Sequence, residues 1–121
     1  MFRTRLALVA LIGAALVFVA SASAAVPTLT GTDGPGFTIT LKKGKTKVTS
    51  LKAGKYKIVI KDLSNIHNFH LTGPGVNKKT GVGPMGTFTW TVTLKKGKKY
   101  TYICTVPGHA AAGMKGTFKA T

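Results

Sequence analysis

The 121-residue sequence predicts an all-β fold, an antiparallel β-sandwich or barrel of about seven to eight short strands that follows a secretory signal peptide. Several short segments alternate apolar with polar residues, which is the period of a half-buried strand. Turns rich in glycine and lysine separate these segments at the spacing of roughly eight to twelve residues that is typical of such folds. No segment after the apolar N-terminus shows a sustained helical period.

The first 24 residues have the three parts of a secretory signal. Residues 1–5 carry two arginines, residues 6–20 are continuously apolar, and residues 21–25 are small, as a signal peptidase requires. We expect cleavage after Ala24 and export to the periplasm or to the extracellular side of the envelope. An uncleaved membrane anchor is the alternative, although the apolar segment falls short of the roughly 20 residues of a spanning helix.

The first half of the remaining chain predicts two clear strands. Residues 25–36 contain several glycines and prolines and predict an irregular lead-in or a short edge strand before a single domain at 37–121. Segments 37–41 and 56–60 alternate apolar with polar residues and predict half-buried strands. The lysine- and glycine-rich residues between them predict turns.

The second half predicts further strands around one long loop. Residues 66–71 predict a strand, and the glycines and prolines of residues 73–86 predict a loop with at most a short turn of structure. Residues 87–94 alternate threonine with large apolar residues and predict the clearest strand in the chain. Residues 100–104 and 116–121 predict the last two strands.

The part of the chain after the signal is strongly basic. Its 16 lysines oppose only Asp33 and Asp62, which gives a net charge near +14. This charge favours an anionic partner, either an acidic redox protein or an anionic envelope surface, and it also keeps a small β protein soluble. The lack of arginine after residue 5 and the export signal argue against nucleic acid as a partner. We expect a monomer that meets a membrane only electrostatically or through an uncleaved signal.

Residues 100–115 contain the only cysteine of the chain, Cys104, together with His109 and Met114 at steps of five residues. A lone cysteine in an exported protein is free, joined to another chain or bound to a ligand. Thiolate, imidazole and thioether suit copper, and two histidines and a cysteine with a weak axial methionine define a blue copper site. A cysteine nucleophile and a zinc site are weaker explanations, because no activating group is evident and methionine is an unusual zinc ligand.

The second histidine would come from the strand predicted before the long loop. In that strand His67, Phe69 and Leu71 share one face, which we expect to point toward the core. Asn68 and His70 share the other face, so His70 is expected at the surface. A register slip of one residue would exchange the two histidines, and a core histidine bonded to a backbone carbonyl is the simpler alternative.

Residues 102–115 closely resemble the copper loop of cupredoxins, the small blue copper proteins, with the cysteine-to-histidine spacing of plant phytocyanins. Residues 67–71 are similar to the His-Asn strand of plastocyanin and amicyanin. The resemblance implies a Greek-key β-sandwich that holds one copper ion, which alternates between Cu(I) and Cu(II). Ala110 replaces the phytocyanin disulfide cysteine, and the cysteine-to-histidine segment is longer than in plastocyanin or amicyanin. The implied ligands are His67, Cys104, His109 and Met114.

The resemblance implies an exported protein that carries single electrons between redox partners and is not an enzyme. Asn68 would tie the His67 segment to the Cys104 loop, and His109 would transfer electrons through a small apolar patch, with surrounding lysines that steer an acidic partner. A copper carrier or storage protein is the alternative, although the chain has no Met-rich or His-rich tract. A copper oxidase or nitrite-reducing enzyme would need more histidines, since only His70 remains. A metal-free adhesive β-sandwich would leave the ligand spacing unexplained.

Overall fold

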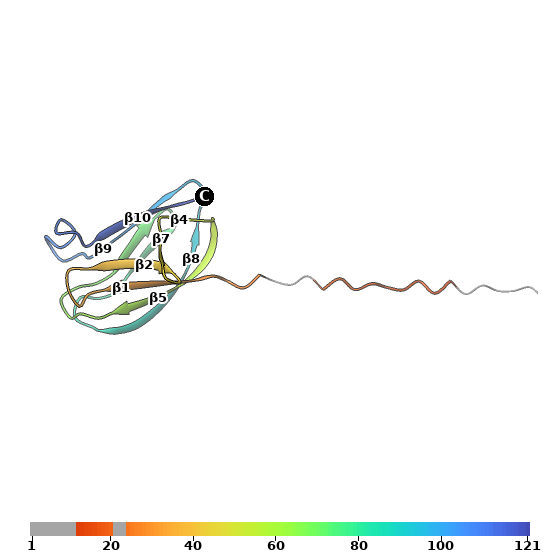
Figure 1. Cartoon of the computed structure of the whole chain (residues 1–121), viewed down its shortest axis with the longest axis horizontal. Helices are drawn as coiled ribbons and strands as arrows, with labels where there is room; N and C mark the ends of the chain where they lie inside the picture. Colours follow the sequence, from red (N-terminus) through yellow and green to blue (C-terminus); the bar gives the residue numbers. More distant parts are fainter. Residues whose placement is uncertain (1–11, 21–23) are drawn as a thin grey trace, which may run out of the picture.

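The computed structural model describes residues 12–20 and 24–121, and the described residues form ten strands in two five-stranded sheets. The two sheets form a sandwich from which the N-terminal segment extends (Figure 1). Within the described part of the chain, no helix is long and apolar enough to span a membrane. The expected signal peptide, residues 1–24, lies mostly outside the described residues, and its cleavage stays a prediction.

The first sheet has the strand order β3-β2-β1-β5-β8. Strands β1 and β5 are parallel, and the other neighbours in this sheet are antiparallel. Its strands are β1 (Thr28–Asp33), β2 (Ile39–Lys43), β3 (Thr46–Lys47), β5 (Gly54–Asp62) and β8 (Gly86–Leu94).

The second sheet has the strand order β4-β10-β9-β6-β7. Strands β4 and β10 are parallel, and the other neighbours are antiparallel. Its strands are β4 (Ser50–Leu51), β6 (His70–Gly73), β7 (Val76–Lys79), β9 (Lys99–Ile103) and β10 (Lys115–Ala120).

The all-β sandwich is confirmed, but the sheets are not wholly antiparallel and the described strands number ten. Residues 28–33, expected in an irregular lead-in or a short edge strand, form β1 in the interior of the first sheet. The glycine that suggested irregularity has a packing role there. A Cβ atom on Gly31 would clash with the end of the Ile60 side chain and lie 3.0 Å from the ring of Phe69, so a larger residue would force these core side chains to shift. Residues 76–79, expected in the loop, form the short edge strand β7. Only one of its residues is buried, so the strand lacks the alternation of buried and exposed residues that would have predicted it.

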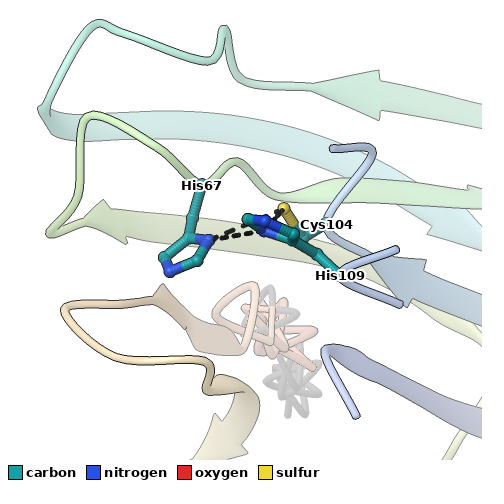
Figure 2. A group of neighbouring side chains, drawn as sticks. All are labelled: His67, Cys104 and His109. Carbon is teal, nitrogen blue, oxygen red and sulfur yellow. Dashed lines mark hydrogen bonds between the residues drawn. The ribbon is translucent and has the colours of Figure 1, made fainter. Parts of the chain in front are cut away.

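The loops that carry the candidate ligands meet at one end of the sandwich. The register places Asp33 beside Asp62 at this end of the first sheet and His70 beside Ile103 at this end of the second. We call this end the loop end. The opposite end, which carries the turns at 43–46, 51–54 and 94–99, is called the turn end. His67, Cys104 and His109 lie together at the loop end (Figure 2).

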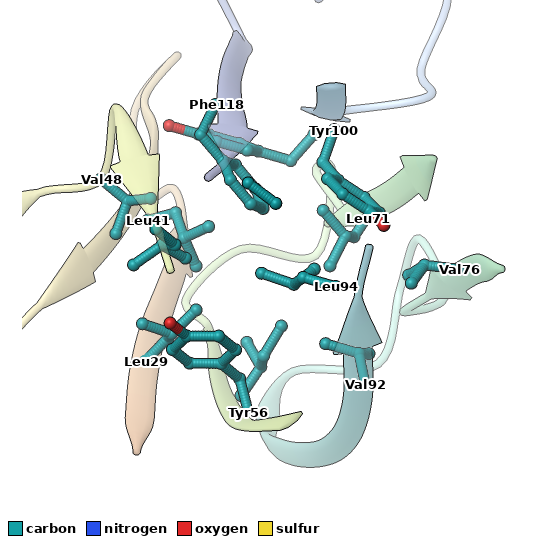
Figure 3. Close-up of a cluster of buried hydrophobic side chains, with 14 of the residues drawn as sticks. Leu29, Leu41, Val48, Tyr56, Leu71, Val76, Val92, Leu94, Tyr100 and Phe118 are labelled. Atoms are coloured by element: carbon teal, nitrogen blue, oxygen red, sulfur yellow. The ribbon is translucent and has the colours of Figure 1, made fainter. Parts of the chain in front are cut away.

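A core of buried aliphatic and aromatic side chains fills the space between the sheets (Figure 3). The alternation predicted for β8 is confirmed, since Val92 and Leu94 are buried between exposed threonines. Near the loop end, the rings of Phe69 and Tyr102 stack with centroids 5.3 Å apart and planes 8° apart. These two residues lie close in sequence to His67 and Cys104, so the stack braces both ligand segments against the core.

Candidate metal centre

Two imidazoles and one thiol converge at the loop end, and their possible ligand atoms all lie within 4.8 Å of one another. The two Nδ1 atoms of His67 and His109 are 2.9 Å apart. The sulfur of Cys104 lies 3.9 Å from Nδ1 of His67 and 3.6 Å from Nδ1 of His109. His67 comes from the segment between β5 and β6, whereas the other two come from the segment between β9 and β10 (Figure 2).

The donor set fits a copper ion. Nitrogen and sulfur ligands lie about 2.0–2.3 Å from a bound metal, so three of them around one ion are roughly 3.5–4 Å apart. The two sulfur–nitrogen distances, 3.9 and 3.6 Å, match this spacing, and the nitrogen–nitrogen distance of 2.9 Å requires only a small opening. Two imidazoles with one thiolate are the equatorial ligands of a blue copper site.

Burial and the neighbouring imidazole of His109 both favour the neutral form of His67. Burial lowers the pKa of His67 below its ordinary value of 6.5, repulsion from His109 lowers it further, and Asp62 acts in the opposite direction. A neutral imidazole has a free lone pair, which metal binding requires. His67 and Cys104 are fully buried, whereas His109 is partly exposed. His109 is therefore the member of this group that solvent reaches.

Met114 closes the loop that begins at Cys104. The backbone N–H of Cys104 donates to the carbonyl of Met114 at 3.1 Å, and the N–H of Met114 donates to the carbonyl of His109, also at 3.1 Å. The tight turns between these residues use positive φ angles of 83° at Gly108 and 111° at Gly113, which favour glycine. The side chain of Met114 is fully buried. The loop thus brings the backbones of all three residues side by side.

Asn68 ties the two ligand segments together, as expected. Its Oδ1 accepts a bond of 2.8 Å from the N–H of Thr105, and its Nδ2 donates to the hydroxyl of Thr105 at 2.9 Å and to the carbonyl of Thr80 at 3.1 Å. The expectation that Asn68 faces outward was wrong. Strand β6 begins only at His70, so His67, Asn68 and Phe69 do not alternate and are all buried.

The prediction that His70 is a surface residue is confirmed. It lies on β6 opposite Lys79, and its Nε2 is 2.7 Å from Oδ1 of Asn77 in an exposed hydrogen bond. It takes no part in the three-residue group formed by His67, Cys104 and His109.

The sequence did not reveal three residues that shape the site. Phe37, expected to begin a core strand, precedes β2 and is 54% exposed, with its ring centroid 5.0 Å from that of His67 and 4.7 Å from that of His109. Thr80 binds both Asn68 and Phe69, and its hydroxyl accepts a bond of 2.9 Å from the N–H of Phe69. Thr105 is the main partner of Asn68. No pattern in the sequence marks the two threonines. Phe37 is distinguished only by its position directly after the glycines of residues 34–36.

The two ends of the sandwich differ in surface chemistry: the loop end is apolar and the turn end is basic. Exposed large apolar side chains of the domain gather in the segments of the loop end, where the structure exposes Phe37, Leu63, Ile66, Val82 and Met85. The lysines do not surround His109 as expected. Ten of the sixteen lie in segments 42–47, 52–55 and 95–99, toward the turn end, and all of these are exposed.

Comparison with solved structures supports the fold. Reduced rusticyanin is 23% identical, with a TM-score of 0.57 over 83% of this chain and 82% of that chain. Reduced auracyanin from the photosynthetic bacterium Roseiflexus castenholzii is 22% identical, with a TM-score of 0.58 over 81% of this chain and 99% of that chain. Rusticyanin from Thiobacillus ferrooxidans is 22% identical, with a TM-score of 0.57 over 82% of this chain and 79% of that chain. At these identities the likeness establishes a shared fold.

Sequence comparison identifies the family. No curated protein matches the chain. Residues 36–121, however, match the family described as "Copper binding proteins, plastocyanin/azurin family". This range covers most of the chain and includes the three converging side chains of His67, Cys104 and His109. The protein therefore belongs to the plastocyanin/azurin family of copper-binding proteins.

Proposed function

We propose that this protein is an exported blue copper protein that carries single electrons between redox partners. The observation that carries the proposal is the buried convergence of two imidazole Nδ1 atoms with one cysteine sulfur, of which only the His109 side is partly open to solvent. Cupredoxins of this family are non-enzymatic electron carriers that typically work outside the cytoplasm, which agrees with the predicted signal peptide.

Four side chains would hold the copper ion. His67, Cys104 and His109 would bind it through Nδ1, Sγ and Nδ1, and the buried Met114 would add a weak axial bond through its sulfur. The bound metal supplies the one-electron chemistry, as it alternates between Cu(I) and Cu(II). Support for Met114 comes from its burial and from its backbone bonds to both Cys104 and His109.

The protein frame limits movement of the ligands. Asn68 joins the His67 segment to Thr105, the residue after Cys104, and the stacked rings of Phe69 and Tyr102 fix the same two segments from the core side. Ligands held from several directions change position little when the charge of the metal changes. Small movement favours fast electron transfer, because little structural reorganisation accompanies each step.

His109 is the proposed point of electron exchange. It is the partly exposed member of the group, and exposed residues of its own loop beside it, Pro107, Ala111 and Ala112, are apolar or small. Phe37 and Ile66, 54% and 52% exposed, extend this apolar surface. A redox partner would dock on it with an apolar face of its own, which brings the two redox centres close without desolvating charged groups.

The lysines at the turn end fit an anionic envelope surface rather than the redox partner. The turn end is also where residues 24–27 enter β1, so the N-terminal segment leaves the domain there (Figure 1). An anionic lipid surface bound at this end would leave the apolar loop end free for a partner. The turn end would face the envelope surface whether the signal is cleaved or kept.

Binding to vesicles tests this orientation. We expect the domain to bind vesicles of anionic phosphatidylglycerol, to release them at high salt and to ignore zwitterionic vesicles. Replacing Lys95, Lys96 and Lys98 by glutamine should weaken binding several-fold, whereas the matched change at Lys61, Lys78 and Lys79, nearer the loop end, should have a much smaller effect. Equal effects of the two triple variants would contradict a directed turn-end surface.

Electron transfer is separated from copper carriage by following both in one sample. The copper-loaded domain is reduced and reoxidised repeatedly by inorganic redox couples in the presence of a Cu(I) chelator. A carrier of electrons should complete many cycles in stopped-flow experiments and keep its copper. Loss of copper to the chelator at the first reduction, with slow reoxidation of what remains, would instead support copper carriage or storage.

A further inference from the structure

The only two acidic side chains of this basic protein are buried side by side. Asp33 and Asp62 face each other across the parallel register of β1 and β5, and they are 0% and 1% exposed. The lysines are all exposed, so none is buried beside the two carboxyl groups. Within the described part of the chain, both oxygens of Asp33 and Oδ2 of Asp62 have no hydrogen-bond partner. Burial and the adjacent Asp62 raise the pKa of Asp33 to about 7. Burying carboxyl oxygens without hydrogen-bond partners costs folding free energy, which indicates that the pair has a function.

One other buried polar atom of the described residues lacks a partner, Nε2 of His67. It lies beside the residues that follow the two aspartates, Gly34 and Leu63, since a Cβ atom on Gly34 would be 3.5 Å from the backbone carbon of Leu63. A Cβ atom on Gly34, the residue after Asp33, would lie 3.5 Å from Cδ2 of His67, the carbon bonded to Nε2. Figure 2 shows this edge of the His67 ring turned away from Cys104 and His109.

The unpartnered atoms are chemically complementary. A histidine that binds a metal through Nδ1 carries its proton on Nε2, so this edge of the His67 ring is a donor. The carboxylate oxygens of Asp62 are acceptors, whereas Asp33, whose pKa is raised to about 7, keeps a proton and can itself donate to Asp62. One oxygen of Asp62 already accepts a bond of 3.2 Å from the N–H of Ser64, and its Oδ2 remains unpartnered. Metal-binding histidines commonly donate their second N–H to a carboxylate, a backbone carbonyl or water, which fixes the ring and its tautomer.

We propose that Asp62 accepts the Nε2–H of His67 through one water molecule, and thereby holds His67 in the tautomer that leaves Nδ1 free for copper. Asp62 is thus a positioning residue that acts through His67. The proton between the two Nδ1 atoms, which are 2.9 Å apart, then belongs to His109, and Nδ1 of His67 accepts it. The inference rests on the proposed copper site, but the tautomer is a property of the metal-free protein.

The tautomer is measured directly by nitrogen NMR of the metal-free domain labelled with ¹⁵N-histidine. We expect His67 to show a protonated Nε2 and an unprotonated Nδ1. A protonated Nδ1 in the native protein would overturn the proposal, whatever any variant does. A native protein that shows the expected tautomer and binds no copper would refute the proposed function alone, so the two failures are distinguishable.

Two variants then identify the acceptor. Asp62→Leu removes the acceptor and should mix the tautomers of His67 and weaken copper binding about 10- to 100-fold, the usual cost of losing such a partner. Asp62→Asn keeps an acceptor oxygen and should retain the tautomer with a smaller loss of affinity. Unchanged tautomer and affinity in a folded Asp62→Leu variant would overturn the proposal. If that variant does not fold, the copper affinities of Asp62→Asn and Asp33→Asn are compared. A larger loss in Asp62→Asn would support Asp62, and an equal or larger loss in Asp33→Asn would overturn its assignment.

Discussion

Replacing Asn68 by alanine tests whether one buried amide holds the two ligand segments together. The change removes four hydrogen bonds, of 2.8, 2.9, 3.1 and 3.2 Å, that join the Asn68 side chain to Thr105 and to Thr80. Each such bond contributes about 0.5–1.5 kcal/mol, and the carbonyl of the buried Thr80 loses a partner as well. Water can replace the partners of the exposed Thr105. We therefore expect a loss of about 2–4 kcal/mol in the free energy of unfolding.

This loss is measured by denaturant unfolding of the metal-free domain, with fluorescence of the single tryptophan, Trp90, as the probe. The ring of Trp90 lies 6.3 Å from that of Phe69, so its emission reports on packing next to Asn68. For a domain of this size the same loss lowers the melting temperature by roughly 10–20 °C. His70→Ala, two residues away and at the surface, is the matched control and should change stability by less than about 0.5 kcal/mol. A similarly small change in Asn68→Ala would refute the reasoning.

Three further predictions concern the ligands and the buried acids. His67→Ala should abolish the blue colour of the copper-loaded protein and His70→Ala should keep it; the opposite pattern in visible spectra would show that the wrong histidine was chosen. Met114→Leu should retain the colour and raise the reduction potential measured by voltammetry, because the lost thioether stabilises Cu(II); an unchanged potential would exclude an axial bond. Asp33 should lower the free energy of unfolding of the metal-free protein by a few kcal/mol from pH 4 to pH 7, because folded Asp33 keeps its proton up to about 7 whereas the unfolded chain releases it near 3.8; the lowered pKa of His67 acts in the opposite direction. Asp33→Asn should flatten this profile in unfolding experiments at several pH values, and a profile as steep as that of the native protein would count against a raised pKa.

The alternation of apolar and polar residues predicted those strands whose two faces differ in burial. The threonine alternation of β8 reports directly which side chains face the core, and the structure has the same arrangement. Strand β1 was expected at most as a short edge strand, because Gly31 resembles a turn residue in the sequence, and its place inside the sheet was not predicted. Its real role is to make room for Ile60 and Phe69, which come from distant parts of the chain.

The structure brings His67, and not His70, to Cys104 and His109, but for a reason that differs in part from the one that predicted it. Strand alternation was expected to turn His67 inward and Asn68 outward, but both are buried because β6 begins only at His70. The resemblance of this segment to the His-Asn motif of known copper proteins supported the same choice independently. Thr80 could not be predicted, because its bond to Asn68 depends on how the segment after β7 folds over the site.

The placement of charge also required the structure. The sequence shows many lysines in turns of similar composition, but not that these turns share one end of the sandwich. Lysines were therefore expected around His109, where the structure instead exposes apolar side chains such as Phe37 and Ile66. The burial of Asp33 beside Asp62 was likewise invisible, because it results from the parallel pairing of β1 with β5.

The most direct test of the central claim is the visible spectrum of the domain after addition of one equivalent of Cu(II). The buried group of His67, Cys104 and His109 predicts an intense blue absorption band from charge transfer between the cysteine sulfur and copper. The band should disappear on reduction, return on reoxidation and be absent in Cys104→Ser. A colourless native protein, or a blue band that persists in Cys104→Ser, would contradict the account.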